Sequence, residues 1–80
     1  MQITVQVTQE DINDGKPTKG FACPVAFALG RATGILWKVD NRQAECPSGG
    51  RVELPLVARF FIRDFDRGFP VKPLSFLIET

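Results

Sequence analysis

The sequence predicts an α+β domain, in which a small, mostly antiparallel sheet carries two helices on one face. Three observations lead to this prediction. Residues 2–8 alternate strictly between apolar and polar side chains, which is the period of a strand with one face in solvent. Residues 55–67 repeat apolar side chains every three to four positions, the period of a helix packed on a sheet. Residues 74–79 alternate again, so a strand closes this pattern.

The segment after the first strand, residues 9–20, is polar and contains two glycines and one proline. It is predicted to be a loop with one helical turn, begun by Thr8 and the acidic pair Glu10 and Asp11. Acidic residues in a loop can bind a cation, but this segment lacks the alternating aspartates and the late glutamate of a calcium loop. We therefore interpret it as a solvated acidic turn at the start of a helix.

A short helix is predicted over Pro24–Thr33. Proline is favoured at the first helical position, and Gly34 directly follows the last one. The apolar stripe of this helix is narrow, so its stability is expected to depend on packing against the sheet. The stripe consists of Val25, Leu29 and Ala32.

Residues 35–39 alternate and are predicted to form a strand, with Ile35, Trp37 and Val39 on one face. Burial in the core is the default expectation for this tryptophan. An exposed tryptophan on a sheet would instead indicate a surface that stacks on a base or docks a partner.

Two more short strands are predicted in the middle of the chain. A two-residue hairpin turn at residues 40–41 leads into a returning strand over residues 42–46, and residues 51–54 form another. The complete order is strand, helix, two or three strands, helix, strand. A ferredoxin-like split arrangement is the nearest standard topology. Eighty residues have room for a single domain over residues 1–80.

The second helix is predicted from Pro55 to about Arg67, and Gly68 ends it. Helical spacing separates its residues into two faces. The buried face is expected to carry Val57, Ala58, Phe61, Ile62 and Phe65, and the opposite face Leu56, Arg59, Phe60, Arg63 and Arg67.

Charge and hydropathy exclude several classes of protein. Ten basic and nine acidic residues give a net charge of +1, which supplies no global field to attract nucleic acid or an anionic membrane. The first residues lack the basic and apolar regions of a signal peptide, and no apolar run is long enough to span a bilayer. A cytosolic location is therefore the default expectation. There Cys23 and Cys46 are expected to be reduced, although the two could in principle pair.

The residue inventory predicts that the chain is not an enzyme. Histidine and tyrosine are absent, so neither a Ser-His-Asp nor a Cys-His arrangement can form. Two cysteines without histidine fall short of a zinc site, and no glycine-rich phosphate-binding loop is present, so no metal or cofactor is predicted. Cys23 is the remaining chemical candidate, because a helix N-terminus lowers the pKa of a thiol. Since no activating partner is evident, we favour a small, semi-buried structural residue.

Arg59, Arg63 and Arg67 recur every fourth residue, which places three guanidinium groups in one row with Phe60 beside them. Three interpretations are open. The row is a solvated helix face, a protein-binding patch of the usual arginine and aromatic composition, or a surface for phosphates.

Acidic neighbours of the row argue against nucleic acid as its ligand. Arg63 can pair with Asp66, and Arg67 with Asp64, which would partly neutralise the row. Three partly neutralised charges would bind phosphates weakly. We therefore favour protein binding over nucleic-acid binding for Arg59, Phe60, Arg63 and Arg67.

Three segments carry a resemblance to known proteins: VTQEDINDG near the start, CPVAFALGRA at the first predicted helix, and FIRDFDRGFPVKPLSFLIE at the end. In these segments the chain resembles a family of small phage-encoded proteins with no assigned activity. Residues 36–50 lie outside the resemblance. The resemblance implies an α+β mini-domain that acts in an infected bacterial cell, with no catalytic residue to transfer to any position.

Small phage accessory proteins of this size often bind and redirect a host protein, sometimes a defence complex. The first hypothesis is therefore a non-enzymatic accessory protein that binds a host protein as an inhibitor or anti-defence (anti-CRISPR-like) factor. The alternatives are a small nucleic-acid-binding module that uses the arginine row, and a minor structural protein. Either a monomer or a homodimer is compatible with the sequence.

Overall fold

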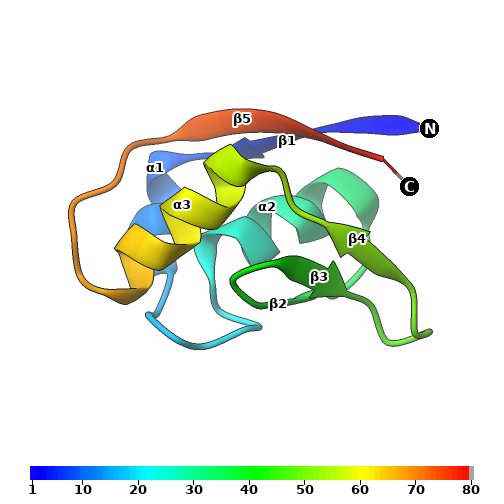
Figure 1. The fold of residues 1–80 in the computed structure, drawn as a ribbon, viewed down its shortest axis with the longest axis horizontal. Helices are drawn as coiled ribbons and strands as arrows, with labels where there is room; N and C mark the ends of the chain where they lie inside the picture. Colours follow the sequence, from blue (N-terminus) through cyan, green and yellow to red (C-terminus); the bar gives the residue numbers. More distant parts are fainter. Residues whose placement is uncertain (80) are drawn as a thin grey trace.

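The computed structural model describes residues 1–79 and has the α+β architecture that the sequence predicts (Figure 1). Both long helices and the outer strands fall where the sequence places them. An additional short helix, α1, occupies the predicted helical turn. The elements in chain order are β1 (Gln2–Val7), α1 (Gln9–Asp14), α2 (Pro24–Thr33), β2 (Lys38–Val39), β3 (Gln43–Glu45), β4 (Arg51–Glu53), α3 (Leu56–Asp66) and β5 (Leu74–Glu79).

The strands form two antiparallel sheets instead of the single sheet of a ferredoxin-like arrangement. One sheet pairs β1 with β5, and the other has the order β2-β3-β4. The middle strands are only two or three residues long, and β4 ends at Glu53. Pro55 is the N-cap of α3 and lies only two residues after β4. The chain therefore turns into the helix before β4 is long enough to pair with β5.

The sheet of β1 and β5 joins the two ends of the described chain. The strands pair antiparallel over their whole length, from Gln2 opposite Glu79 to Val7 opposite Leu74. Their inner face is buried and their outer face lies in solvent, which agrees with the alternation of both segments. The buried residues of the two strands are Val5, Val7, Phe76 and Ile78.

The three-stranded sheet contributes one short row to the core. Val39, Ala44 and Val52 lie opposite one another on the three strands, and all of them are buried. This register places the hairpin turn one residue later than predicted, at residues 41–42. The side chain of Asp40 explains the shift, because its carboxylate accepts hydrogen bonds from the backbone N–H groups of residues 42 and 43 at 2.7 and 2.8 Å.

Residues 35–37 are not part of a strand, although a continuous strand was predicted over residues 35–39, and β2 begins only at Lys38. The Thr33 hydroxyl accepts hydrogen bonds from the Trp37 indole N–H at 2.8 Å and from the Ile35 backbone N–H at 3.2 Å. Gly34 is in the left-handed conformation, with a φ of 73°. These contacts bury Trp37, as expected, but they leave Ile35 exposed, so the prediction that both share a buried strand face is wrong.

The two long helices supply most of the remaining core. α2 packs against β1 and buries Val25 and Leu29 completely. α3 buries Ala58, Phe61, Ile62 and Phe65, whereas Val57 is exposed and does not belong to the predicted apolar face. In residues 1–79, no helix has both the length and the apolar character needed to cross a membrane.

Candidate functional site

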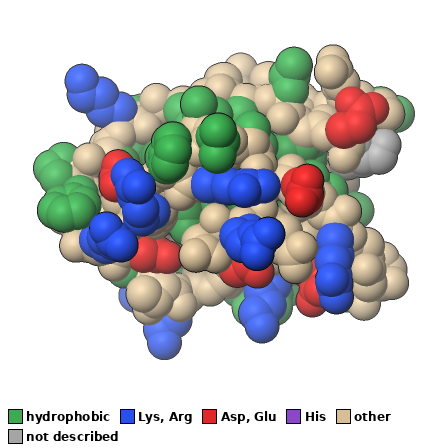
Figure 2. Space-filling view, in the orientation of Figure 1, with side chains coloured by type: hydrophobic (Ala, Val, Ile, Leu, Met, Phe, Trp, Pro, Cys, Tyr) green, Lys and Arg blue, Asp and Glu red, His purple; other side chains and the backbone are tan. Residues whose placement is uncertain are grey.

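The side of α3 that faces away from the core carries apolar and basic side chains together. We call Leu56, Phe60, Arg63 and Arg67 the α3 outer face. Leu56 is 62% exposed and Phe60 is 50% exposed, and one helical turn separates them. Figure 2 shows hydrophobic and basic side chains side by side over this helix. Such an arrangement of aromatic, aliphatic and arginine side chains is typical of protein-binding surfaces.

The arginine row predicted from the sequence is not uniform. Arg59 is half-buried at the flank of the outer face, and its Nε donates a hydrogen bond to the Leu54 carbonyl oxygen at 2.8 Å. Leu54 precedes the N-cap residue Pro55, so its carbonyl oxygen accepts no backbone hydrogen bond from within the helix. Arg59 therefore has a structural role in joining β4 to α3, and it is removed from the candidate site.

Arg63 lies over the ring of Phe60, with its guanidinium carbon 5.0 Å from the ring centroid. The same guanidinium also contacts the Asp64 carboxylate at 3.3 Å, and not Asp66, which was the predicted partner. Asp66 instead accepts a hydrogen bond from the Thr18 backbone N–H at 2.9 Å. Arg63 and Phe60 thus form a cation–π contact while both side chains remain exposed.

Arg67 is the C-cap residue directly after α3 and is exposed. Its backbone N–H donates to the Arg63 carbonyl oxygen, which fixes the backbone of this residue at the helix end. Within residues 1–79 its guanidinium has no acidic partner, and the predicted pairing with Asp64 is not formed. Of the three predicted arginines, Arg67 is therefore the one whose charge remains available to a ligand.

Comparison with protein-family models, with curated proteins and with solved structures gives no match. The case for any site on this chain consequently depends on its geometry. Among the described residues, no group of three or more histidine, cysteine, aspartate or glutamate side chains is arranged to hold a metal ion.

Cys23 does precede α2, as predicted, but it does not have the properties of a reactive thiol. Its side chain is buried, and burial raises its pKa to about 11, although backbone N–H groups at the start of the helix act in the opposite direction. The nearby Asp66 carboxylate raises the pKa further. These properties agree with the structural interpretation of Cys23.

The two free thiols are expected to differ sharply in reactivity. At neutral pH, iodoacetamide should modify Cys46 of the native protein and leave Cys23 unmodified, as intact-protein mass spectrometry would show. Cys46 is only half-buried, and a contact between its Sγ and the Ser48 hydroxyl at 3.1 Å lowers its pKa. Cys46→Ser should abolish labelling until urea unfolds the chain. Equal labelling of both thiols in the native state would contradict the structure.

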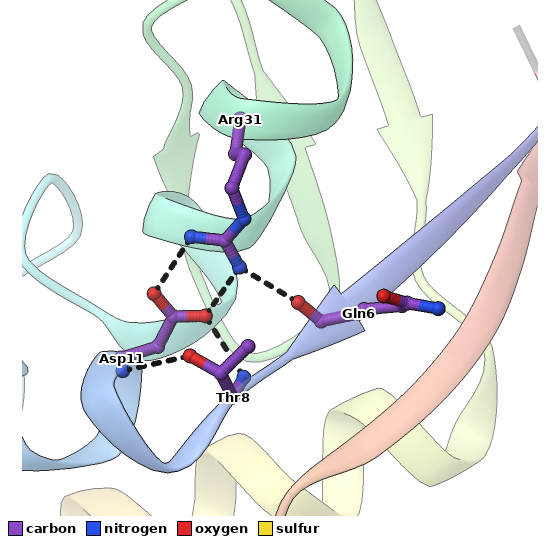
Figure 3. A network of polar contacts seen from close by, with 4 residues as sticks. All are labelled: Gln6, Thr8, Asp11 and Arg31. Atoms are coloured by element: carbon purple, nitrogen blue, oxygen red, sulfur yellow. Dashed lines mark hydrogen bonds and ion pairs between the residues drawn. The ribbon is translucent and has the colours of Figure 1, made fainter.

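A second polar site, which the sequence analysis missed, lies between α1, α2 and β1 (Figure 3). Asp11 was predicted to be solvated, but it is buried, and Arg31 approaches its two carboxylate oxygens at 2.7 and 3.1 Å. Burial favours a higher pKa for Asp11, yet hydrogen bonds from Arg31 and the Thr8 backbone outweigh it and hold the pKa below the usual range. Arg31 also donates to the Gln6 carbonyl oxygen at 2.9 Å.

The same carboxylate completes a capping box at the start of α1. Asp11 accepts from the Thr8 backbone N–H at 2.9 Å, and its own N–H donates to the Thr8 hydroxyl at 3.2 Å. The spacing of threonine and aspartate could have predicted this box. The pairing with Arg31 could not be predicted in that way, because it joins residues 20 positions apart. This network fixes α1, and among the described residues no buried side-chain nitrogen or oxygen lacks a hydrogen-bond partner.

Proposed function

We propose that this chain is a non-enzymatic accessory protein of phage origin that binds a host protein through the α3 outer face. The observation that supports this proposal is the exposed Phe60 ring, which Arg63 covers on one side. An aromatic side chain has only two rotatable side-chain bonds, so it loses little conformational entropy when it enters a pocket of a partner. Leu56 adds an exposed aliphatic side chain one turn away.

The contacts of the arginines favour a protein partner over nucleic acid. Of the three arginines, Arg63 contacts a carboxylate and the Nε of Arg59 donates to the Leu54 carbonyl oxygen, so within residues 1–79 Arg67 is the one whose guanidinium is not engaged. One such charge on a protein of net charge +1 gives little phosphate affinity. The apolar residues of the outer face would contribute nothing to contacts with phosphates, whereas they match the core of a protein interface.

The choice of a host protein as the partner follows from the resemblance to small phage-encoded proteins. Accessory proteins of that kind have no need of a catalytic centre, because occupying a functional surface of the target is sufficient to inhibit it. An inhibitor or anti-defence factor, acting in the bacterial cytoplasm without a cofactor, is therefore the function that we propose.

Affinity capture from lysate of a bacterial host, followed by mass spectrometry, would test this proposal. The double variant Phe60→Ala/Arg63→Ala is expected to lose the captured partner. Both side chains are exposed, so the free energy of unfolding should change by less than about 0.5 kcal/mol. Leu36→Ala/Arg42→Ala is the matched control, because it also removes one exposed apolar side chain and one exposed arginine, but away from α3.

The expected result is one host protein that the wild type and the control capture and the Phe60/Arg63 variant does not. Capture of the same proteins by all three chains would show that the α3 outer face is not the binding site. Recovery of nucleic acid that is released steeply as salt rises would support the alternative nucleic-acid function instead.

A further inference from the structure

Strand β1 has one edge paired with β5 and one edge without a strand partner. The Gln6 carbonyl oxygen accepts its hydrogen bond from Arg31, which lies on the side of β1 opposite β5 (Figure 3). Backbone groups of alternate residues in a strand point to the same side. The N–H and C=O groups of Gln2 and Thr4 therefore also point away from β5. We call the backbone edge formed by residues 2, 4 and 6 the β1 free edge, because no strand within residues 1–79 pairs with it. Its Gln6 carbonyl oxygen already accepts one hydrogen bond, from Arg31, and a carbonyl oxygen can accept a second.

The free edge lacks the features that usually prevent strands from pairing between molecules. Such features are lysine, proline, glycine-induced bulges or a covering segment. The sequence of β1, QITVQV, has no charge, no proline and no glycine over six residues. By contrast, the edge strand β2 of the other sheet is only two residues long, and its Val39 N–H donates to the Gly20 carbonyl oxygen at 3.0 Å.

The free edge lies beside a groove in the protein surface. This groove of about 280 Å³ runs between β1 and α2. Its walls are formed by Thr4 and Gln6 on the strand and by Ala28, Arg31 and Ala32 on the helix.

We propose that β1 pairs antiparallel with β1 of a second copy of this chain, with Thr4 opposite Thr4 across the two-fold axis. This register would place Gln2 opposite Gln6 of the other copy. The result is a continuous four-stranded sheet in the order β5-β1-β1-β5. The proposal concerns a different surface from the α3 outer face and does not depend on the proposed function.

A second copy fits this edge better than an unrelated segment does. An antiparallel edge is complementary to itself, so one uncharged strand can supply both halves of a two-fold interface. No like charges would meet, because the facing side chains are threonine and glutamine. Leu77 lies opposite Thr4 in the existing sheet, so a row Leu77-Thr4-Thr4-Leu77 would cross all four strands. The sheet of β1 and β5 has two strands, and dimerisation would extend it to four.

Sedimentation equilibrium of the wild type and two lysine variants would test the proposal. The wild type is expected to form a dimer, and Thr4→Lys should weaken self-association by about tenfold or more, because two ammonium groups would face each other across the axis. Ser75→Lys is the matched control. It places the same charge on the same exposed sheet face, but on β5, two strands away from the axis, and it should remain dimeric.

A disulfide trap gives an independent positive readout. In a Cys46→Ser background, Thr4→Cys should form a covalent dimer on oxidation, because directly opposite residues of an antiparallel pair lie about 5.5 Å apart. Ser75→Cys should not form one. A monomeric wild type at the highest attainable concentration would overturn the proposal. So would a Thr4→Lys variant that dimerises like the wild type, or loss of the dimer in both lysine variants.

Discussion

Leu29→Ala is expected to lower the free energy of unfolding by about 3 kcal/mol. Leu29 lies on α2 with no exposed surface, between this helix and the rest of the core. Its truncation removes apolar contacts and leaves a cavity, because α2 is held against β1 and cannot move to fill the space. A domain of this size has only modest stability, so such a loss would leave a substantial fraction of the chain unfolded at elevated temperature.

Urea unfolding, followed by the fluorescence of the buried Trp37, would measure this effect. Leu36→Ala is the matched control, because it is the same substitution at a side chain that is 62% exposed. It should change the free energy of unfolding by less than about 0.5 kcal/mol. If the two variants differed by less than about 1 kcal/mol, α2 would not be packed as the structure describes.

The elements with strong local signals could be predicted from the sequence. β1 and β5 alternate along their whole length, and α2 is bounded by Pro24 and Gly34. The division into two sheets could not be predicted, because it depends on which strands pair over long separations. It also depends on the shortness of β2, β3 and β4, which carry too few residues for a clear period.

The candidate site was predictable in position but not in detail. Helical spacing correctly placed Phe60 and Arg63 on the exposed side of α3. The same spacing grouped them with Arg59. The role of Arg59 depends on its hydrogen bond to the carbonyl oxygen of Leu54, which directly follows β4. Sequence spacing predicts on which face of the helix a side chain lies. It does not predict that the Arg59 Nε donates to the Leu54 carbonyl oxygen, because the position of that oxygen depends on the path of the chain before the helix.

Asp11→Asn is expected to lower the free energy of unfolding by about 2 kcal/mol at pH 7. The amide keeps the size of the carboxylate, but it cannot accept two hydrogen bonds from the Arg31 guanidinium while also accepting one from the Thr8 N–H. The side chain of Arg31 is 54% exposed, so solvent screens the charge attraction, and the hydrogen bonds account for most of the loss. Asp14→Asn, at an exposed position of the same helix, should have little effect.

The effect of Asp11→Asn should depend on pH in a defined direction. The folded-state pKa of Asp11 lies below its usual value of 3.8, so the folded state favours the carboxylate. The stability that the carboxylate contributes is therefore complete above the unfolded pKa and is lost as the pH falls through the folded pKa. The difference between the wild type and Asp11→Asn should be constant from pH 5 to 7 and shrink below about pH 4. A difference that grew as the pH fell would mean that the folded protein favours the protonated acid, contrary to the contacts of Arg31 and Thr8.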